Sequence, residues 1–224
     1  MKLKASLHLH TAEDLVEGGI IKYDIYRLID EARESGFKVL ALTCHKFFVY
    51  KKEYGDYAKR KGMLLIPGVE ASLRKKHVLI LNADKGADKV KSFKQLAGYK
   101  KKKPDILVIA AHPNFGFKVS MGIKLLKNNI DLFDAIENSW FYSRFFNLNK
   151  KVKKIAQKYN KPMIATADLH DLRYLNGDYA IISAPRMEIK DVLSAIKNGY
   201  FVNVTSPKNF FKLASYVLKL FSGR

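Results

Sequence analysis

Two histidines one residue apart, His8 and His10, lie near the start of the chain in the apolar run KASLHLH. Successive side chains of an extended strand point to opposite faces, so the spacing predicts that both imidazoles share one face and that Leu7 and Leu9 take the other. Such a pair is either two hydrogen-bonded histidines of the core or surface, or two neutral imidazoles that hold one metal ion. The metal interpretation predicts carboxylates and further histidines at the ends of other strands.

The other four histidines also lie in or beside short apolar segments. His45 follows KVLALTC, His112 ends DILVIAAH and His170 comes just after PMIATAD, whereas His77 opens the segment HVLILN. Five of the six histidines therefore lie at or just past a predicted strand end. Histidines scattered through a core would not be expected to do this, so the pattern favours one shared site.

Two carboxylates also lie at predicted strand ends, as the histidines do. Glu70 ends the apolar segment MLLIPGVE, and Asp168 lies two residues before His170 in ATADLHD. A carboxylate at the end of a buried strand is costly unless it is paired or coordinated, which favours a metal or ion-pair role for both. Asp14 follows HLHTA in a polar loop, where a turn or a helix N-cap is an equally good interpretation.

The elements that must position these residues are alternating strands and helices. Apolar segments predict strands at 4–9, 38–43, 63–70, 77–82, 105–112, 133–138 and 162–168. Helical spacing predicts helices at 21–37, 50–62, 120–129, 143–160, 187–199 and 207–221, and the Lys-rich run at 91–103 reads as the solvated end of another, closed by Pro104. Repeated βα units imply a mainly parallel sheet, open or barrel-like, whose chemistry lies at the carboxyl ends of the strands.

Length and composition bound the remaining possibilities. The chain has 224 residues and 48% hydrophobic content, which fits one α/β barrel domain or two small domains, and without a visible linker we expect a single domain over residues 1–224. No signal peptide or run of 18 apolar residues is evident, so we expect a cytoplasmic protein without a membrane partner. One cysteine, Cys44, excludes an internal disulfide framework.

The charge balance points to anionic ligands. Lys plus Arg total 41 and Asp plus Glu total 21, a formal net charge of +20. Such a field attracts phosphate-bearing ligands, although a Lys-rich surface also serves solubility or a hot habitat. Because the lysines run along the whole chain without an aromatic-interleaved cluster, we expect a small phosphorylated substrate as the partner, with nucleic acid as the second choice.

The motifs HLHT, TCH, PGVE, AAHP and ADLH, in this order from residue 8 to residue 170, resemble the polymerase and histidinol phosphatase (PHP) superfamily. The tail pattern DVLSAIKNGYFVNVTS resembles the end of such a domain, so the resemblance covers nearly the whole chain. It implies a distorted (β/α)7 TIM-like barrel with a cluster of two or three divalent ions at the carboxyl ends of its strands. An imidazole-rich set suits Zn, Mn or Fe better than Mg.

The same resemblance implies a ligand set. A first ion would be held by His8, His10, Glu70 and Asp168. Glu70 would bridge to a second ion completed by His77 and His112, and Asp14, His45 and His170 would hold a third. Glu70, Asp168 and His170 are the implied catalytic residues. Two positions depart from the family pattern, since Ser6 and Cys44 stand where aspartates are common, and neither belongs to the implied ligand set.

The resemblance implies hydrolysis of a small phosphate monoester, in which a hydroxide held by the metals attacks phosphorus. The alternatives are a phosphodiesterase or exonuclease acting on nucleotides or short oligonucleotides, and a non-catalytic metal-binding module. Cations near the motifs that could contact a substrate phosphate are Lys46, Arg74, Lys118, Arg144 and Arg173, each of which could instead be a solvated surface residue.

Side chains beside the motifs have structural interpretations as well. Trp140, Phe141 and Tyr142 could stack on a ring of the substrate or pack in the core. Cys44 alternates with Thr43 and His45, so it should point away from the ligand face. We therefore expect it to pack rather than to act as a nucleophile.

Overall fold

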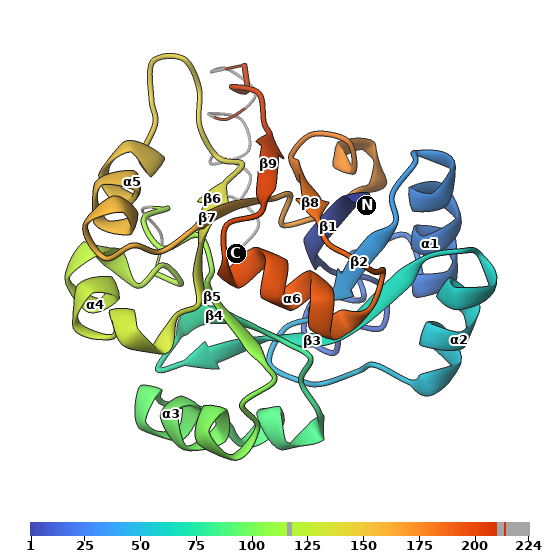
Figure 1. Cartoon of the computed structure of the whole chain (residues 1–224), viewed down its shortest axis with the longest axis horizontal. Coiled ribbons are helices and arrows are strands. Elements are labelled where there is room, and N and C mark those ends of the chain that lie inside the picture. Colours follow the sequence, from blue (N-terminus) through green and yellow to red (C-terminus); the bar gives the residue numbers. More distant parts are fainter. Residues whose placement is uncertain (116–117, 210–212, 214–224) are drawn as a thin grey trace.

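A single sheet organises the residues that the computed structural model describes, which are 1–115, 118–209 and 213. Within them, nine strands follow the order β7-β6-β5-β4-β3-β2-β1-β8-β9 (Figure 1). The strands are β1 (Lys2–Leu9), β2 (Val39–Leu42), β3 (Leu64–Leu73), β4 (Lys76–Leu81), β5 (Leu107–Ala110), β6 (Ala135–Ser139), β7 (Met163–Thr166), β8 (Tyr179–Ser183) and β9 (Phe201–Val204). All seven strands expected from the sequence are present, and β8 and β9 were not expected.

The sheet is mainly parallel, as the βα pattern predicts. β1, β2 and β3 are parallel, as are β5, β6 and β7, whereas β4 and β8 run antiparallel to both neighbours. The reversal at β4 is a tight hairpin whose two turn residues, Arg74 and Lys75, have φ of 51° and 68°. Positive φ at both central positions is the geometry that matches the twist of a two-residue hairpin.

The described residues form six α-helices that pack against the sheet: α1 (Ile25–Glu34), α2 (Lys52–Arg60), α3 (Phe93–Lys102), α4 (Gly122–Asn128), α5 (Asn149–Lys158) and α6 (Ile189–Lys197). Short 3-10 turns lie at Lys85–Lys89, Ile130–Leu132 and Leu172–Tyr174. Side chains cap two of the helices, because Asp24 accepts from the Arg27 N–H at the start of α1 and Ser92 from the Gln95 N–H at the start of α3. The helix expected at 207–221 lies largely outside the described residues.

The buried side chains form an inner core and two outer ones. Alternate residues from β1 through β8 fill the barrel interior, and α6 packs across one end of it with Val192, Leu193 and Ile196 (Figure 1). Outside the sheet, α1 and α2 cover β1 to β3, while α3, α4 and α5 cover β3 to β6. The end of the barrel opposite α6 is left for polar side chains.

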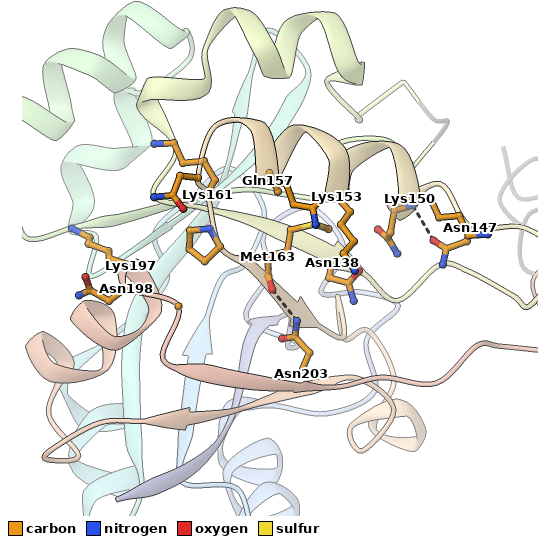
Figure 2. A pocket seen from close by; sticks show the side chains of 15 residues that line it. Asn138, Asn147, Lys150, Lys153, Gln157, Lys161, Met163, Lys197, Asn198 and Asn203 are labelled. Atoms are coloured by element: carbon orange, nitrogen blue, oxygen red, sulfur yellow. Dashed lines mark hydrogen bonds between the residues drawn. The ribbon is translucent and has the colours of Figure 1, made fainter.

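The two ends of the sheet meet at a seam. Near the α6 end, the Asn203 amide pairs with β7 as a neighbouring strand would. Its Nδ2 donates to the Met163 carbonyl at 2.8 Å (Figure 2), and its Oδ1 accepts from the Ala165 N–H, also at 2.8 Å. At the opposite end, the Leu169 N–H donates to the His8 carbonyl at 3.0 Å. The sheet is thus nearly closed, which confirms the predicted α/β class and the distorted TIM-like barrel.

No α-helix among the described residues is long and apolar enough to cross a membrane.

Candidate metal centre

A β-bulge aims the first two histidines into the barrel. β1 pairs with β2 in one register up to Ser6↔Leu40, and the register has shifted by one residue at Leu9↔Leu42. Leu7 packs in the interior core, so simple alternation would turn His8 outward. The extra residue lets His8 and His10 follow Leu7 into the interior while Leu9 packs outside against α1. The prediction that both histidines share a face is confirmed, and the expectation that Leu7 joins Leu9 is wrong because of this bulge.

The reversed direction of β4 explains the one histidine that precedes its strand. An antiparallel strand begins at the end of the sheet where its parallel neighbours finish, so His77 at the start of β4 reaches the same end of the barrel as the others. Its Nδ1 lies 2.8 Å from Oε1 of Glu70.

Glu70 lies at the centre of the cluster and is almost fully buried. It extends from β3 toward the interior, on the same side as Ile66, and its two oxygens divide the imidazoles between them. Oε1 lies 3.3 Å from His8 Nε2 and 3.1 Å from His112 Nε2, and Oε2 lies 3.1 Å from His45 Nε2 and 3.7 Å from His10 Nε2. A carboxylate placed between several imidazoles has the geometry of a bridging ligand.

Asp168 and His170 form the more accessible edge of the cluster. Oδ1 of Asp168 lies 3.4 Å from His8 Nε2 and 3.5 Å from His10 Nε2. The side chains of Asp168 and His170 are 17% and 30% exposed, whereas His8 and His10 are fully buried. A substrate would therefore approach from this side.

The backbone is strained at two candidate ligands. His112 has φ of 25° and Asp168 has φ of 47°, although neither is a glycine. The unusual φ turns His112 back toward Glu70, while its neighbour Ala111 also faces the interior. Strain of this kind concentrates at functional sites, where the surrounding structure holds it in place.

Asp14 contacts the outer nitrogens of two histidines. Its Oδ2 lies 3.1 Å from His10 Nδ1 and 2.8 Å from His45 Nδ1, and it also accepts from the His45 backbone N–H. Its Oδ1 accepts from the N–H groups of Val16 and Glu17. The carboxylate is thus occupied in orienting imidazoles whose Nε2 atoms face the centre of the cluster.

Two acidic residues that sequence reasoning missed complete the site. Glu137 on β6 is fully buried, and its Oε2 lies 3.0 Å from His8 Nδ1. Glu17, in the loop after β1, has Oε2 3.2 Å from His170 Nε2. Glu137 is the last residue but one of the apolar segment FDAIEN, close to the position that Glu70 has at the end of its own segment, so the same reasoning could have found it. Glu17 lies in a polar loop without a comparable signal.

The electrostatic environment favours a cation. Burial lowers the pKa of His8, but the charges of Asp168, Glu70 and Glu137 outweigh it and raise that pKa well above its usual value. Burial likewise raises the pKa of Glu70, and His77 and His8 overcome it, so this pKa lies well below the ordinary range. A negative field that holds a proton this strongly in the protein without metal also attracts a divalent ion, which competes with that proton.

The buried donor atoms fit a metal. Nε2 of His8, Nε2 of His10 and Oε2 of Glu70 are buried and make no hydrogen bond with described residues. Leaving such atoms unsatisfied is costly unless an ion binds them. Among the described residues, potential ligand atoms form four groups, and the atoms inside each group lie within 4.8 Å of one another: His8–His10–Asp168, His8–Glu70–His112, His45–Glu70–His77 and His10–His45–His170. The centre therefore brings together eight of the nine predicted ligands, and Asp14 lies behind two of them.

The predicted phosphate contacts are peripheral. Lys46, Arg74, Lys118, Arg144 and Arg173 are all exposed. Arg173 forms an ion pair with Asp171, with Nη2 and Oδ2 2.5 Å apart, and its guanidinium is therefore already occupied. The role of these five cations stays a prediction.

The remaining side chains near the motifs are largely structural. Cys44 is buried in the outer core under α1 and α2, as its alternation with Thr43 and His45 predicts. Burial and the charge of Asp14 raise the pKa of its thiol to about 12, which does not suit a nucleophile. Phe141 is buried, whereas Trp140 and Tyr142 are half-buried.

Comparison with known proteins agrees with this geometry. A family model described as the PHP domain matches residues 6–206, nearly the whole chain. None of the curated proteins compared with the chain matches it.

Solved structures share the fold at low sequence identity. PsfC from Pseudomonas syringae is 13% identical with a TM-score of 0.67, over 98% of this chain and 99% of that one. A two-domain protein from Bacteroides vulgatus, containing a predicted PHP-like metal-dependent phosphoesterase, is 16% identical with a TM-score of 0.66 over 92% of this chain. This chain spans 65% of that protein's length. An amidohydrolase from Chromobacterium violaceum, solved with bound sulfate and no metal, is 15% identical with a TM-score of 0.57, over 74% of this chain and 87% of that one.

Proposed function

Since the chain belongs to the PHP domain family, we propose that it is a metal-dependent phosphoesterase whose substrate is a small phosphate monoester. The observation that carries this proposal is the arrangement around Glu70, where buried imidazole nitrogens and carboxylate oxygens converge and three of these atoms, Nε2 of His8, Nε2 of His10 and Oε2 of Glu70, make no hydrogen bond with described residues.

His8, His10 and Asp168 would hold one ion, and Glu70 would share a second with His45 and His77 or with His8 and His112. The imidazole-rich donor set suits Zn, Mn or Fe better than Mg. Bound ions of this type lower the pKa of water toward neutrality and neutralise charge that builds on phosphoryl oxygens.

Two carboxylates behind the ligands set their orientation. Glu137 accepts from Nδ1 of His8, and Asp14 faces Nδ1 of both His10 and His45. Each contact fixes the imidazole tautomer whose Nε2 faces the centre, and the negative charge makes that nitrogen a better donor to a cation. These residues are positioning residues that need not touch the substrate.

His170 and Glu17 occupy the edge from which a substrate enters. Nδ1 of His170 is held 2.9 Å from the Asp168 carbonyl, so Nε2 faces Glu17 and the solvent side. We assign His170 the transfer of a proton from Nε2 to the leaving-group oxygen, which departs as an alcohol. An ion at His10, His45 and His170 that used Nε2 of His170 would have to displace Glu17 from this nitrogen.

The test is a screen of phosphate monoesters, diesters and short oligonucleotides with added Mn²⁺, Zn²⁺ or Mg²⁺. We expect release of inorganic phosphate from a monoester that depends on the metal and disappears in Glu70→Gln. If protein shown by elemental analysis to hold metal hydrolysed none of these esters, the non-catalytic alternative would replace this proposal.

A further inference from the structure

A basic cleft lies on the outer side of the barrel, away from the metal ligands. It has a volume of about 800 Å³ and runs between α5, the start of β7 and the segment joining α6 to β9 (Figure 2). The side formed by α5 carries Lys150, Lys153 and Gln157, and Asn203 lies on the opposite side. Lys161 and Lys197 lie toward one end of the cleft. None of the residues that line it is an aspartate or a glutamate.

The positive charge of α5 works against the stability of the helix. Lys150 and Lys151 lie in its first turn, where the helix dipole disfavours cations, and no acidic residue offsets them there. Lys150 and Lys154 are also like charges four residues apart. A bound anion would relieve both repulsions.

Several polar groups in the cleft remain available to a ligand. The side chains of Lys150, Lys153 and Lys161 make no hydrogen bond or ion pair with a described residue, and the same holds for the amides of Asn138 and Gln157. Other lining groups serve the fold: Lys197 donates to the Ile106 carbonyl, and the Asn149 amide bonds to both the N–H and the carbonyl of Ser139. The Asn149 contacts anchor α5 to β6, so α5 holds the side chains of Lys150, Lys153 and Gln157 in a fixed position relative to the sheet.

Exposed aromatic side chains lie close in sequence to both ends of the cleft. Phe145, in the loop that leads into α5, is 91% exposed, and this loop also supplies the lining residue Asn147. At the other end, Tyr200 is 62% exposed and follows the lining residue Gly199. Aromatic surfaces beside a basic groove are characteristic of proteins that stack the bases of a single strand.

We propose that this cleft binds single-stranded nucleic acid, with the lysines on its phosphates, the amides on base edges and Phe145 stacked on a base. The residues of α5 that line the cleft run from Asn149 to Gln157, a length of about 12 Å at 1.5 Å per residue, which is longer than one nucleotide. The site is distinct from the metal centre.

The cleft and the metal centre share β6. Asn138 lines the cleft, while its neighbour Glu137 contacts His8 on the opposite face of the strand. The Asn147 end of the cleft lies at the carboxyl end of β6, which is also the end of the barrel where the ligands lie. The inference rests on the proposed phosphoesterase function only if the bound strand is also the substrate, in which case a terminal phosphate of the strand would be the monoester that is hydrolysed. As a binding site it stands without hydrolysis.

The experiment measures binding without turnover. Fluorescence anisotropy of a labelled single-stranded RNA or DNA of about 12 nucleotides would be recorded with chelator present, across a salt series. Three to four lysine–phosphate contacts predict a slope of about −2 to −3 in log K against log salt. The triple variant Lys150→Gln, Lys153→Gln, Lys161→Gln should bind at least about tenfold more weakly, with a slope shallower by about 2. Phe145→Ala should lose about fivefold or more with an unchanged slope.

The matched control removes the same charge elsewhere. Lys94, Lys101 and Lys102 are exposed on α3, which covers another part of the barrel (Figure 1). Their triple Gln variant should bind the strand as the unmodified protein does. Equally weakened binding of the strand by both triple variants would show that the general positive field of the +20 chain attracts it. If a mononucleotide or inorganic phosphate displaced the labelled strand as effectively as an unlabelled strand does, the cleft would be a site for small anions. Either result, or no binding at low salt, overturns the proposal whether or not the protein hydrolyses a monoester.

Discussion

Glu137→Gln is expected to weaken metal binding about tenfold without unfolding the protein. Oε2 of Glu137 lies 3.0 Å from His8 Nδ1, and both residues are fully buried. Oε1 makes no hydrogen bond with a described residue, so His8 is the hydrogen-bond partner of this carboxylate, whose charge also acts on His112. The glutamine oxygen can still accept from Nδ1–H and preserve the tautomer, which leaves the loss of charge as the main effect.

Glu137→Ala should cost more, about 100-fold, because it removes the acceptor as well as the charge and frees the His8 ring to rotate. The difference between the two variants thus separates the electrostatic part of the contact from the orienting part. The assay is a competitive titration of Zn²⁺ or Mn²⁺ against a chromophoric chelator, with turnover and circular dichroism measured on the same samples.

Glu188→Gln is the charge control. Glu188 is exposed, and its Oε1 lies 3.4 Å from Nη1 of Arg186, so its ion pair is with an arginine and not with a histidine of the cluster. This variant should leave metal affinity unchanged. Wild-type affinity in both Glu137 variants would refute the reasoning, because the carboxylate would then be a buried residue without influence on His8. Equal losses in Glu137→Gln and Glu188→Gln would trace the effect to net charge alone.

Other perturbations test neighbouring parts of the argument. Glu70→Gln should bind less metal than any single histidine variant and lose almost all turnover while staying folded; wild-type activity would remove the bridging assignment. Cys44→Ser should keep substantial metal-dependent activity, because burial raises the pKa of the thiol to about 12, and lost turnover with intact metal content would indicate a covalent mechanism instead. Arg74→Asn with Lys75→Gly should raise the free energy of unfolding in urea by about 1–2 kcal/mol, since both positions have positive φ; an increase in KM as well would support a phosphate contact by Arg74. Chelation should lower Tm, and an unchanged Tm after confirmed metal loss would contradict a stabilising centre.

Hydrophobic patterning predicted most of the fold because the buried strands carry strong signals. The segments that became β2, β5 and β7 are short apolar runs covered on both faces, and the amphipathic helices between them are equally clear. β8 and β9 were missed because each is only half-buried, and because β9 contains Asn203, a residue that strands disfavour. That asparagine closes the barrel seam, which is a tertiary role that local propensity does not express.

The site was predictable as far as side-chain chemistry at strand ends could reach. The search for acidic side chains near strand ends identified Glu70 and Asp168, and strand alternation placed Cys44 on the other face. The same search applied to the segment FDAIEN would have added Glu137. The bulge in β1 could not be foreseen, because a one-residue register shift depends on the pairing partner and not on the strand's own pattern. Glu17 reaches His170 only through the course of the loop after β1.

The two ends of the barrel interior differ in how they are stabilised. Toward α6, alternating aliphatic side chains and the helix itself fill the interior, and this packing needs no ligand. Toward the histidines, His112 and Asp168 hold unfavourable φ angles and buried ligand atoms lack hydrogen bonds, so this end costs free energy in the protein alone. The packing of the apolar end does not depend on the polar end, so its stabilising free energy can offset part of that cost. An ion that binds only the folded chain would offset the remainder, by about 4 kcal/mol at a thousandfold excess over its Kd. The features that make the polar end unfavourable by itself are therefore the ones that suit it to binding a metal ion.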